Sequence, residues 1–270
     1  MILINGDTAA AISAADRGLS YGDGVFRTMT MLAREPRNWS LHYHKLSDDC
    51  ARLGIMCPPK EIFAADLAQI FAQEQGCVVK IIVTRGAGAR GYGVSGKMAP
   101  TRIVISSALP AYSAEYLSAG ISARLCDLRL SRQPQLAGIK HLNRLEQVIA
   151  RSEWNDPAIA EGLLLDEAGW VIGGTMSNVF IIRRRQLFTP LLTGSGVAGV
   201  TRARIMALAP RLGLTVSVTH IDLTALMAAD EVLLCNSVIG LWSVRELAGK
   251  CWDTGQFAPA IRALLESDDD

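Results

Sequence analysis

The sequence predicts two domains that combine helices and β-strands, of the α/β or α+β class, and three observations support this prediction. The chain has 270 residues, enough for one large domain or two of ordinary size. Half of its residues are hydrophobic and a fifth are charged, as in a globular protein with a substantial core. Short β-rich runs alternate with stretches of helical periodicity, and Pro110 opens a polar stretch between the two halves. We expect an N-terminal domain over residues 1–112, a linker over 113–119 and a C-terminal domain over 120–270.

The first half is expected to contain β-strands and two helices. The first strand ends at Asn5-Gly6, a strong turn dipeptide. Ser40 can cap a helix whose apolar residues recur in steps near 3.6, and Gly54 supplies its C-terminal stop. A second helix follows Pro58-Pro59. The expected strands cover residues 2–5, 25–32, 78–84 and 103–107, and a polar loop joins the first two.

The second half is expected to alternate strands and helices. A strand over 121–128 precedes a helix over 142–154. The runs 163–165 and 170–172 pair across a turn, and a second hairpin joins 179–182 to 187–190. Several glycines precede Val200-Thr201, where another helix begins. The remaining elements are strands over 214–221 and 231–235 and helices over 223–228 and 257–265.

Charge and cysteine usage exclude several classes of function. The 27 basic residues nearly balance the 26 acidic ones, so no strong field attracts nucleic acid or an anionic membrane. No apolar run has the length of a membrane span, and the N-terminus is too short and too quickly polar for a signal peptide. The six cysteines have neither a CxxC pair nor metal-ligand spacing. We therefore expect a cytoplasmic protein with reduced cysteines and no metal site.

Lys140 is the first candidate for chemistry, because it stands between an apolar dipeptide and apolar residues that recur at helical spacing. These residues are Leu142, Leu145, Val148 and Ile149, so Lys140 is expected at or just before a helix start. In apolar surroundings near the positive end of a helix dipole, a lysine loses its proton more readily. The neutral amine can form a Schiff base or take a proton. The alternative is a solvated lysine that leads into an ordinary helix.

The glycine-rich segment 86–91 matches GxGxxG, but the following residues cannot open the helix that a dinucleotide site requires. Arg85 directly precedes this segment and Arg90 lies within it. They either belong to a loop that binds substrate carboxylates through paired hydrogen bonds, or lie at a solvated hairpin tip.

The run from Ala137 to Val148 resembles the lysine segment of the aminodeoxychorismate lyases. These enzymes belong to the fold-type-IV class that depends on pyridoxal 5'-phosphate (PLP), together with branched-chain and D-amino-acid aminotransferases. The resemblance extends over most of the chain and implies the two-domain fold of that class, with Lys140 bound covalently to PLP. Other matching segments are Leu3–Gly6, Asp16-Arg17, Gly22–Gly24, Arg90–Tyr92, Asp166–Val171, Asn178–Phe180, Asp230–Val232 and Asn236-Ser237.

The resemblance also implies which residues bind the cofactor phosphate. The backbone amides of Val200 and Thr201, with the Thr201 hydroxyl, are expected to bind it at a helix N-terminus. Asn236 and Ser237 match a further loop on the phosphate side. The alternative for each of these residues is a cap or turn role, in which Thr, Ser and Asn are common.

Three positions depart from the family's pattern. Lys45 matches an arginine that binds the PLP phosphate, and lysine supplies the charge without the two-pronged geometry. Gly173 matches a glutamate that pairs with the ring nitrogen, and without that carboxylate the ring withdraws electrons less strongly. Arg27 stands where relatives often carry a smaller or acidic residue, and it either contacts a carboxylate or faces solvent.

By this resemblance the protein is expected to be a homodimeric 4-amino-4-deoxychorismate lyase of folate biosynthesis, which releases pyruvate and forms 4-aminobenzoate with PLP. Formation of an aromatic ring drives this reaction, so Gly173 should harm a lyase less than a transaminase. Arg90, Arg85, Tyr92 and Arg27 are the candidate substrate-binding residues. The alternatives are a D-amino-acid or branched-chain aminotransferase, and a protein of this fold that has lost PLP and serves as a binding or regulatory module.

Overall fold

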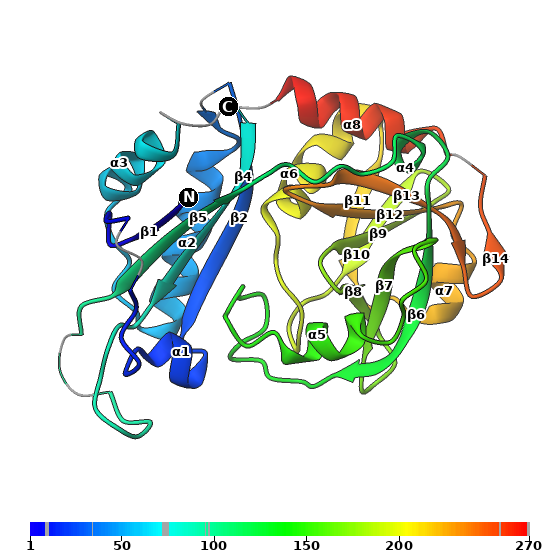
Figure 1. Ribbon diagram of the computed structural model, residues 1–270. Coiled ribbons are helices and arrows are strands. Elements are labelled where there is room, and N and C mark those ends of the chain that lie inside the picture. Colours follow the sequence, from blue (N-terminus) through cyan, green and yellow to red (C-terminus); the bar gives the residue numbers. More distant parts are fainter. Residues whose placement is uncertain are drawn as a thin grey trace. The chain divides into compact units, whose positions relative to one another are not determined.

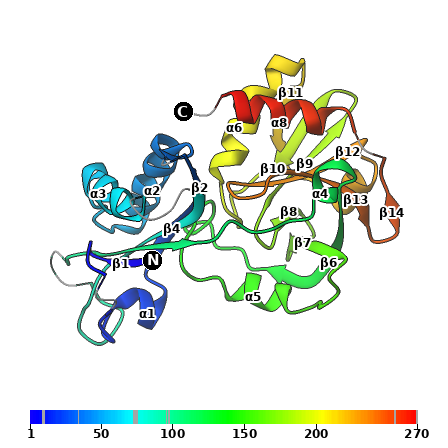
Figure 2. The same ribbon diagram turned by 45° about the horizontal axis from the view of Figure 1, so that its top comes forward.

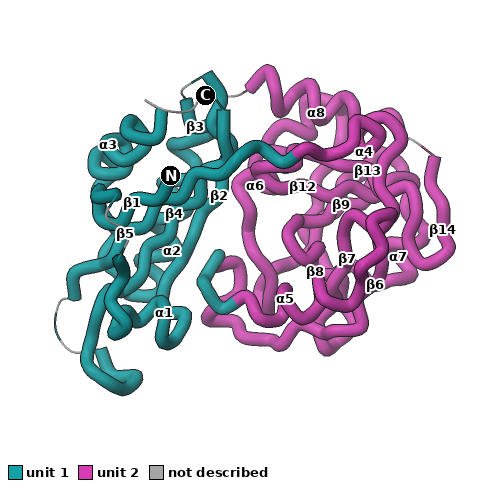
Figure 3. Tube along the Cα trace, viewed as in Figure 1, with its two compact units in different colours: residues 1–110, 140–143, 270 teal, residues 111–139, 144–269 magenta. Residues whose placement is uncertain are grey.

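The computed structural model describes residues 1–8, 11–33, 35–71, 76–94, 96, 98–253 and 255–268. They form two compact units of mixed helix and strand, as the sequence predicts (Figures 1 and 3). Of the described residues, 1–110 and 140–143 belong to the first unit, and 111–139 and 144–268 to the second. None of the described helices is long and apolar enough to cross a membrane.

Within its described residues, the first unit is built on a five-stranded antiparallel sheet in the order β1-β5-β4-β2-β3. Strands β2 and β4 pair along their whole length, from Gly24 opposite Thr84 to Leu32 opposite Gly76. This long pairing gives the unit a rigid centre. The strands are β1 (Ile2–Ile4), β2 (Gly24–Leu32), β3 (Glu35–Pro36), β4 (Gly76–Thr84) and β5 (Thr101–Ser107).

Helices α2 (Trp39–Leu53) and α3 (Lys60–Phe71) lie on the same side of this sheet (Figure 2). Helix α2 packs on β2 and α3 packs on β5. The Phe63 ring of α3 joins the helices, because its centroid lies 6.0 Å from that of Trp39 and 6.2 Å from that of Tyr43. Gly54 ends α2 with a φ of 64°, as predicted, whereas the helix begins one residue before Ser40.

A short helix, α1 (Arg17–Tyr21), replaces the polar loop that was expected between β1 and β2. The Asp16 carboxylate caps it by accepting a hydrogen bond from the Gly18 N–H at 2.8 Å. Five residues are too few to show helical periodicity, so the sequence pattern could not reveal this helix.

In the described part of the second unit, nine strands form one sheet, with eight in the order β11-β10-β9-β12-β13-β6-β7-β8 and β14 beside β13. The two predicted hairpins, β7 with β8 and β9 with β10, are present and antiparallel. The β10–β11, β13–β6 and β6–β7 pairs are parallel. The strands are β6 (Ile121–Leu130), β7 (Ile159–Asp166), β8 (Val171–Gly174), β9 (Asn178–Arg183), β10 (Gln186–Pro190), β11 (Thr215–Thr219), β12 (Glu231–Asn236), β13 (Gly240–Leu247) and β14 (Lys250–Cys251).

The second sheet has a hydrophobic core on each face. On β12, Val232 and Leu234 join one core, while Leu233 and Cys235 join the other. Helices α6 and α8 pack together over the second core, and both lie beside the sheet in Figure 1. The helices of this unit are α4 (Glu115–Ser118), α5 (Leu145–Arg151), α6 (Val200–Leu208), α7 (Leu223–Met227) and α8 (Phe257–Ser267), with a 3₁₀-helix over Ala209–Leu212.

Three further features differ from the sequence predictions. Helix α5 is shorter than the expected helix over 142–154, and its Leu145, Val148 and Ile149 are exposed rather than packed on a core. Strand β13 lies in the middle of the sheet and was not predicted. The segment 140–143 belongs to the first unit, although the sequence analysis assigned Lys140 to the C-terminal domain.

Candidate active site

Lys140 lies in a short extended segment and not at a helix start. The segment extends the first sheet, because the Phe26 N–H donates to the Lys140 carbonyl and the Leu142 N–H donates to the Gly24 carbonyl, both at 2.9 Å. Helix α5 begins only at Leu145, five residues later. A helix dipole acts within about one turn, so the expected effect of a helix start on Lys140 is wrong.

The Lys140 amine instead lies against an aromatic ring. Its Nζ is 4.3 Å from the centroid of Phe26, and the Nζ of Lys80 is 4.8 Å from the same centroid. Lys80 lies on β4 directly opposite Thr28, which puts it on the face of the sheet that Phe26 occupies. The structure therefore places two lysine side chains at one ring, and the sequence analysis had identified only Lys140.

A buried carboxylate on α2 connects Lys140 to two further cations. Asp49 accepts hydrogen bonds from Lys45 Nζ on Oδ1, from Arg27 Nη2 on Oδ2, and from the Lys140 backbone N–H on Oδ2 at 3.0 Å. We call Arg27, Lys45 and Asp49 the Asp49 cluster. The Arg27 side chain is 2% exposed, so the alternative that it faces solvent is wrong. The Lys45 side chain, 22% exposed, is held beside Lys140 by the same carboxylate.

Arg85 is bound within the first unit. Its Nε and Nη2 donate to the two oxygens of Asp23 at 2.7 and 3.0 Å, and it also donates to the carbonyls of Leu53 and Gly54 at the end of α2. Burial alone would raise the pKa of Asp23, but hydrogen bonds from Arg85 and Arg17 hold that pKa below its ordinary value. Four of the five Arg85 donors are used. We therefore do not propose Arg85 as a substrate ligand, contrary to the expectation.

Arg90 and Tyr92 lie on a loop whose backbone is fixed by Arg17. The buried Arg17 guanidinium donates to the carbonyls of Gly91 at 2.9 Å and of Tyr92 at 3.1 Å. The Arg90 side chain is exposed and makes no hydrogen bond or ion pair with another described residue. Tyr92 is 84% exposed, and its ring centroid lies 5.3 Å from that of Tyr21. The loop thus has a fixed backbone and presents both side chains to solvent.

In the second unit, the start of α6 has the features of an anion site. Gly199 at the N-cap has no side chain that could satisfy the first N–H groups of the helix. The Thr201 and Ser237 hydroxyl oxygens lie 3.1 Å apart. Asn178 fixes the approach to the helix, because it accepts from the Gly199 N–H at 3.2 Å and donates to the Val197 carbonyl at 2.7 Å. Val200, Thr201 and Ser237 are thus brought together as the sequence predicted for a phosphate site.

Asn236 has a structural use in the same region. Its Oδ1 accepts from the N–H groups of Val238 and Ile239 at 2.8 and 2.9 Å, and its Nδ2 donates to the Met176 carbonyl at 3.1 Å. These bonds define the turn after β12. Of the two alternatives for Asn236, the structure gives it the turn role.

Gly173 lies on β8 with little room for a side chain. A Cβ at this position would be 2.7 Å from the Ser177 carbonyl oxygen, although its φ is not in the left-handed region. A buried carboxylate is present nearby on β7, since Glu161 accepts from the hydroxyls of Thr175 at 2.5 Å and Ser177 at 2.8 Å. Glu161 accepts its hydrogen bonds from the Gly162 N–H and from the turn that precedes β9, so the role that these contacts show is structural.

A family model decides the assignment of the chain. The model of amino-transferase class IV matches residues 24–247, which include Lys140 and the start of α6. This chain belongs to the amino-transferase class IV family.

Individual relatives agree with membership of the class IV family. Aminodeoxychorismate lyase from Vibrio harveyi is 33% identical over 241 residues, which are 89% of each chain. The crystal structure of 4-amino-4-deoxychorismate lyase from Pseudomonas aeruginosa superposes with a TM-score of 0.95 at 40% identity, covering 99% of each chain. The branched-chain amino acid aminotransferase of Escherichia coli has a TM-score of 0.86 at 22% identity over 99% of this chain and 93% of its own, which shows a common fold.

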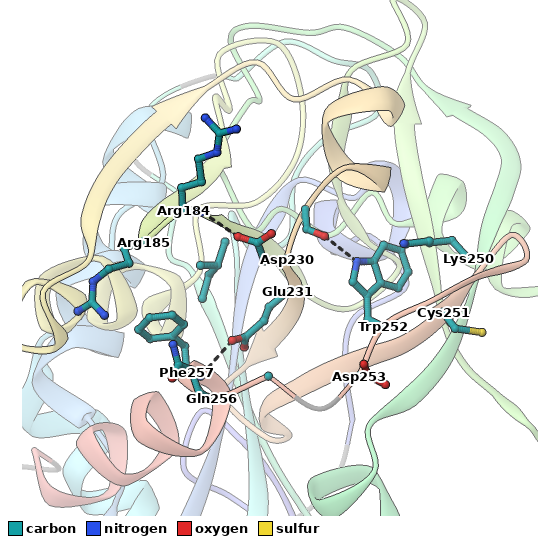
Figure 4. A pocket seen from close by; sticks show the side chains of 13 residues that line it. Arg184, Arg185, Asp230, Glu231, Lys250, Cys251, Trp252, Asp253, Gln256 and Phe257 are labelled. Carbon is teal, nitrogen blue, oxygen red and sulfur yellow. Dashed lines mark hydrogen bonds between the residues drawn. The ribbon is translucent and has the colours of Figure 1, made fainter.

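This class IV chain also has a hollow of about 450 Å³ in its second unit, at the opposite end of β12 from Asn236 (Figure 4). Glu231, at the start of β12, accepts from the Phe257 N–H at 3.1 Å there, and burial raises the pKa of its carboxyl group. The six residues of β12 span roughly 20 Å at about 3.3 Å per residue. The hollow is therefore separate from the Thr201–Ser237 pair.

Sequence reasoning gave no role to three residues that the structure places around Lys140 or the Arg90 loop: Asp49, Lys80 and Arg17. Asp49 follows Lys45 by four residues on one helix, a spacing at which opposite charges meet. That signal was available. Lys80 and Arg17 act across strands and loops, and no sequence spacing reveals such contacts.

Proposed function

We propose that this protein is a 4-amino-4-deoxychorismate lyase, which uses PLP to release pyruvate and form 4-aminobenzoate. The likeness to the Pseudomonas aeruginosa lyase carries this proposal, because 40% identity extends over 99% of both chains. The Lys140 segment and the start of α6 lie within the matched family region. Each has the chemistry that such an enzyme requires.

The geometry of the residues fits PLP, independently of the similarity to known lyases. The α6 start offers N–H groups without a side-chain cap and two adjacent hydroxyls, which suits a phosphate group. Lys140 offers an amine beside an aromatic face. We assign Lys140 to the covalent link and Val200, Thr201 and Ser237 to the phosphate. When bound, PLP supplies an electron-withdrawing ring.

The protein's own residues move the protons. Lys140 Nζ takes a proton from C4 of the substrate and later returns one to the departing three-carbon unit. The Phe26 ring covers one side of this amine. The Lys140 N–H donates to Asp49 and the Lys140 carbonyl accepts from the Phe26 N–H, so the backbone from which the amine extends is held in place.

Arg90 is the substrate-binding residue that the loop geometry supports best. Its guanidinium is exposed and makes no bond with another described residue, so its donors are available to a substrate carboxylate. The exposed Tyr92 ring beside it can pack on the ring of the substrate. This assignment makes Arg90 a determinant of specificity for a dicarboxylate.

The decisive experiment compares two reactions of the purified protein. Pyruvate and 4-aminobenzoate should appear in equal amounts from aminodeoxychorismate, faster than any amino group is transferred from D-alanine or a branched-chain amino acid. Faster transamination would support the aminotransferase alternative. Gly173 favours the lyase, because formation of an aromatic ring lessens the need for a protonated ring nitrogen. Absence of the visible absorbance of bound PLP would support the cofactor-free alternative.

We further infer a homodimer that works in the cytoplasm in folate biosynthesis. Leu145, Val148 and Ile149 of α5 are 73%, 58% and 56% exposed, and positions i, i+3 and i+4 share one helix face. An exposed apolar face of this kind supports a protein interface. Light scattering should give twice the mass of one chain. The double variant Leu145→Asp/Val148→Asp should have the mass of a single chain.

A further inference from the structure

Two cysteines of the first unit meet where helix α2 ends. Cys50 lies in the last turn of α2 and is fully buried, whereas Cys57 lies just beyond the helix and is only partly buried. Their thiols are hydrogen-bonded to each other. An accessible thiol with a second thiol beside it can be oxidised first and then captured by its neighbour. We propose that Cys50 and Cys57 form a modification site, at which a peroxide oxidises the two thiols reversibly to a disulfide.

The backbone brings the two residues together independently of the thiol contact. After the helix the chain turns back, because the Ile55 N–H donates to the Cys50 carbonyl at 2.8 Å. Tyr43 precedes Cys50 by seven residues and so shares its face of α2, and the Tyr43 hydroxyl donates to the Pro58 carbonyl at 3.2 Å. The segment between these two bonds therefore runs back along that face, and Cys57 belongs to it.

The turn that joins the two cysteines is also braced from the sheet of the first unit. Arg85 donates to the carbonyls of Leu53 and Gly54 at 2.7 and 2.6 Å, and its remaining bonds go to Asp23. The helix end and the returning segment are thus held in place. Closure of the disulfide does not require the two thiols to find each other, which favours the reaction.

The hydrogen bond between the thiols gives them different reactivity. The bond from the Cys50 thiol lowers the pKa of Cys57, although burial acts in the opposite direction. The same bond raises the pKa of Cys50, and burial adds to this effect. The accessible Cys57 is therefore the readier of the two to form the nucleophilic thiolate, and Cys50 stays protonated until it reacts.

A peroxide is the one co-reactant that the reaction needs. The Cys57 thiolate attacks an oxygen of hydrogen peroxide, the O–O bond breaks, hydroxide leaves and a sulfenic acid forms. The Cys50 sulfur then attacks the Cys57 sulfur and the S–O bond breaks. The departing hydroxide takes the Cys50 proton and leaves as water. The two thiols lose two electrons in total, which reduce the peroxide to water, and a thiol reductant restores both cysteines by exchange.

The site adjoins the group that holds the Lys140 backbone. Asp49 directly precedes Cys50 in α2, and its carboxylate accepts from the Lys140 N–H at 3.0 Å. Closure of the disulfide draws the last turn of α2 toward Cys57 and moves Asp49 with it. Because a small displacement of a reactive group lowers the rate, the disulfide should slow pyruvate release by about ten-fold. This readout rests on the proposed function, whereas disulfide formation itself does not.

The test exploits a trypsin site at Arg52, between the two cysteines. The tryptic peptides 46–52 and 53–60 each contain one cysteine. The full chain is treated with hydrogen peroxide, its remaining thiols are blocked with N-ethylmaleimide, and the digest is analysed by mass spectrometry without reduction. The two peptides should appear as one species, lighter by two hydrogen atoms than their sum. Dithiothreitol should separate them and, once the peroxide has been removed, restore pyruvate release.

Three controls separate pairing from exposure. Cys251 is exposed on β14 in the second unit, so it should be oxidised without entering an internal disulfide. Cys57→Ser should give no linked peptide, and its pyruvate release should not respond to the peroxide. Cys50→Ala should leave Cys57 as a sulfenic acid that dimedone traps, because the second thiol is absent.

The outcomes that overturn the proposal are distinct from a failure of the proposed function. If Cys251 is oxidised while peptides 46–52 and 53–60 stay separate, the pair is not a modification site. If the peptides are linked and pyruvate release is unchanged, the disulfide does not act on Asp49. A chain that is not a lyase releases no pyruvate even when reduced, and the linked peptide then decides the proposal alone.

Discussion

Arg27 and Arg90 belong to the same unit, and their surroundings are opposite. Arg27 is 2% exposed and is held by a carboxylate that also binds the Lys140 backbone. Arg90 is exposed on a loop that Arg17 fixes only through backbone carbonyls. The contrast separates a guanidinium whose partners lie within the fold from one that is accessible to a ligand.

The largest effect on activity is expected from a substitution at Lys140, whose backbone binds the Asp49 cluster. Lys140→Ala should abolish turnover, because it removes the Nζ to which we assign the proton transfers. It should change the free energy of unfolding by less than about 1 kcal/mol, because Asp49 and Phe26 bind the backbone of residue 140. Pyruvate release and denaturant unfolding measure the two effects. Near-normal release by the variant would exclude Lys140 from the reaction.

Loss of the Asp49 carboxylate should destabilise the cluster that holds Arg27. Asp49→Ala leaves Arg27, Lys45 and the Lys140 N–H without their common acceptor, and removal of one partner from a buried ion pair costs about 3–5 kcal/mol. Asp48→Ala on the same helix is the control and should cost less than about 0.5 kcal/mol. Urea unfolding decides between them. Equal losses would mean that the cluster is not a source of stability.

On the accessible side, Arg90→Ala should raise KM about ten-fold, leave kcat nearly unchanged and leave the melting temperature unchanged. Its control is Arg85→Ala, which should lower the melting temperature because Asp23 and the end of α2 lose their donor. Steady-state kinetics with aminodeoxychorismate and thermal unfolding test the pair. A melting temperature that falls in both variants would contradict the contrast between a bound and an available arginine.

Gly173 extends the comparison to the second unit. Any side chain there meets the Ser177 carbonyl, so Gly173→Glu and Gly173→Gln should both lose about 1–3 kcal/mol of stability. Only the glutamate adds a charge, so only it should raise a slow transaminase reaction. Stability and both reaction rates must be measured together. Identical rates in the two folded variants would mean that a carboxylate at this position does not control the chemistry.

The smallest effect concerns acid stability of the glycine-rich loop. Asp23 has a folded-state pKa below its ordinary value of 3.8, so its contribution is present above about pH 4 and is lost as the pH falls toward the folded pKa. Asp23→Asn should flatten the acid side of the stability curve. Thermal unfolding from pH 6 to pH 3 would show this. An unchanged acid slope would exclude Asp23 as the acid-sensitive group.

The sequence predicted most elements whose patterns are local. Alternation, helical periodicity and turn residues can each be recognised within one segment of the sequence. They predicted the strands at 25–32 and 78–84, the helix that ends at Gly54 and both hairpins. Strand β13 was missed because its apolar positions are interrupted by Ser243, Arg245 and Glu246. Its place in the sheet depends on partners in β12 and β6 that are distant along the chain.

The candidate site shows the same limit. The resemblance identified Lys140, and the helix start at Val200-Thr201 followed from the glycines before it. The binding partners of Arg27 and Arg85 could not be predicted, because each side chain crosses to another element. The apolar residues after Lys140 also led to a wrong prediction of a helix packed on a core, since Leu145, Val148 and Ile149 are exposed. Periodicity shows that residues share a face but does not show what covers that face.

The pairing of the Lys140 segment with β2 has a consequence for the order of folding. Val25 bridges to His141, and Gly24 and Phe26 bond with the same segment, although more than a hundred residues separate the two strands. While the chain is being synthesised, the backbone groups along one edge of this stretch of β2 therefore stay unpaired until the Lys140 segment has been made. Closing such a long loop is slow, and the sheet becomes whole only when the lysine is in place. A nascent chain that stops before residue 140 should therefore be prone to association through this edge.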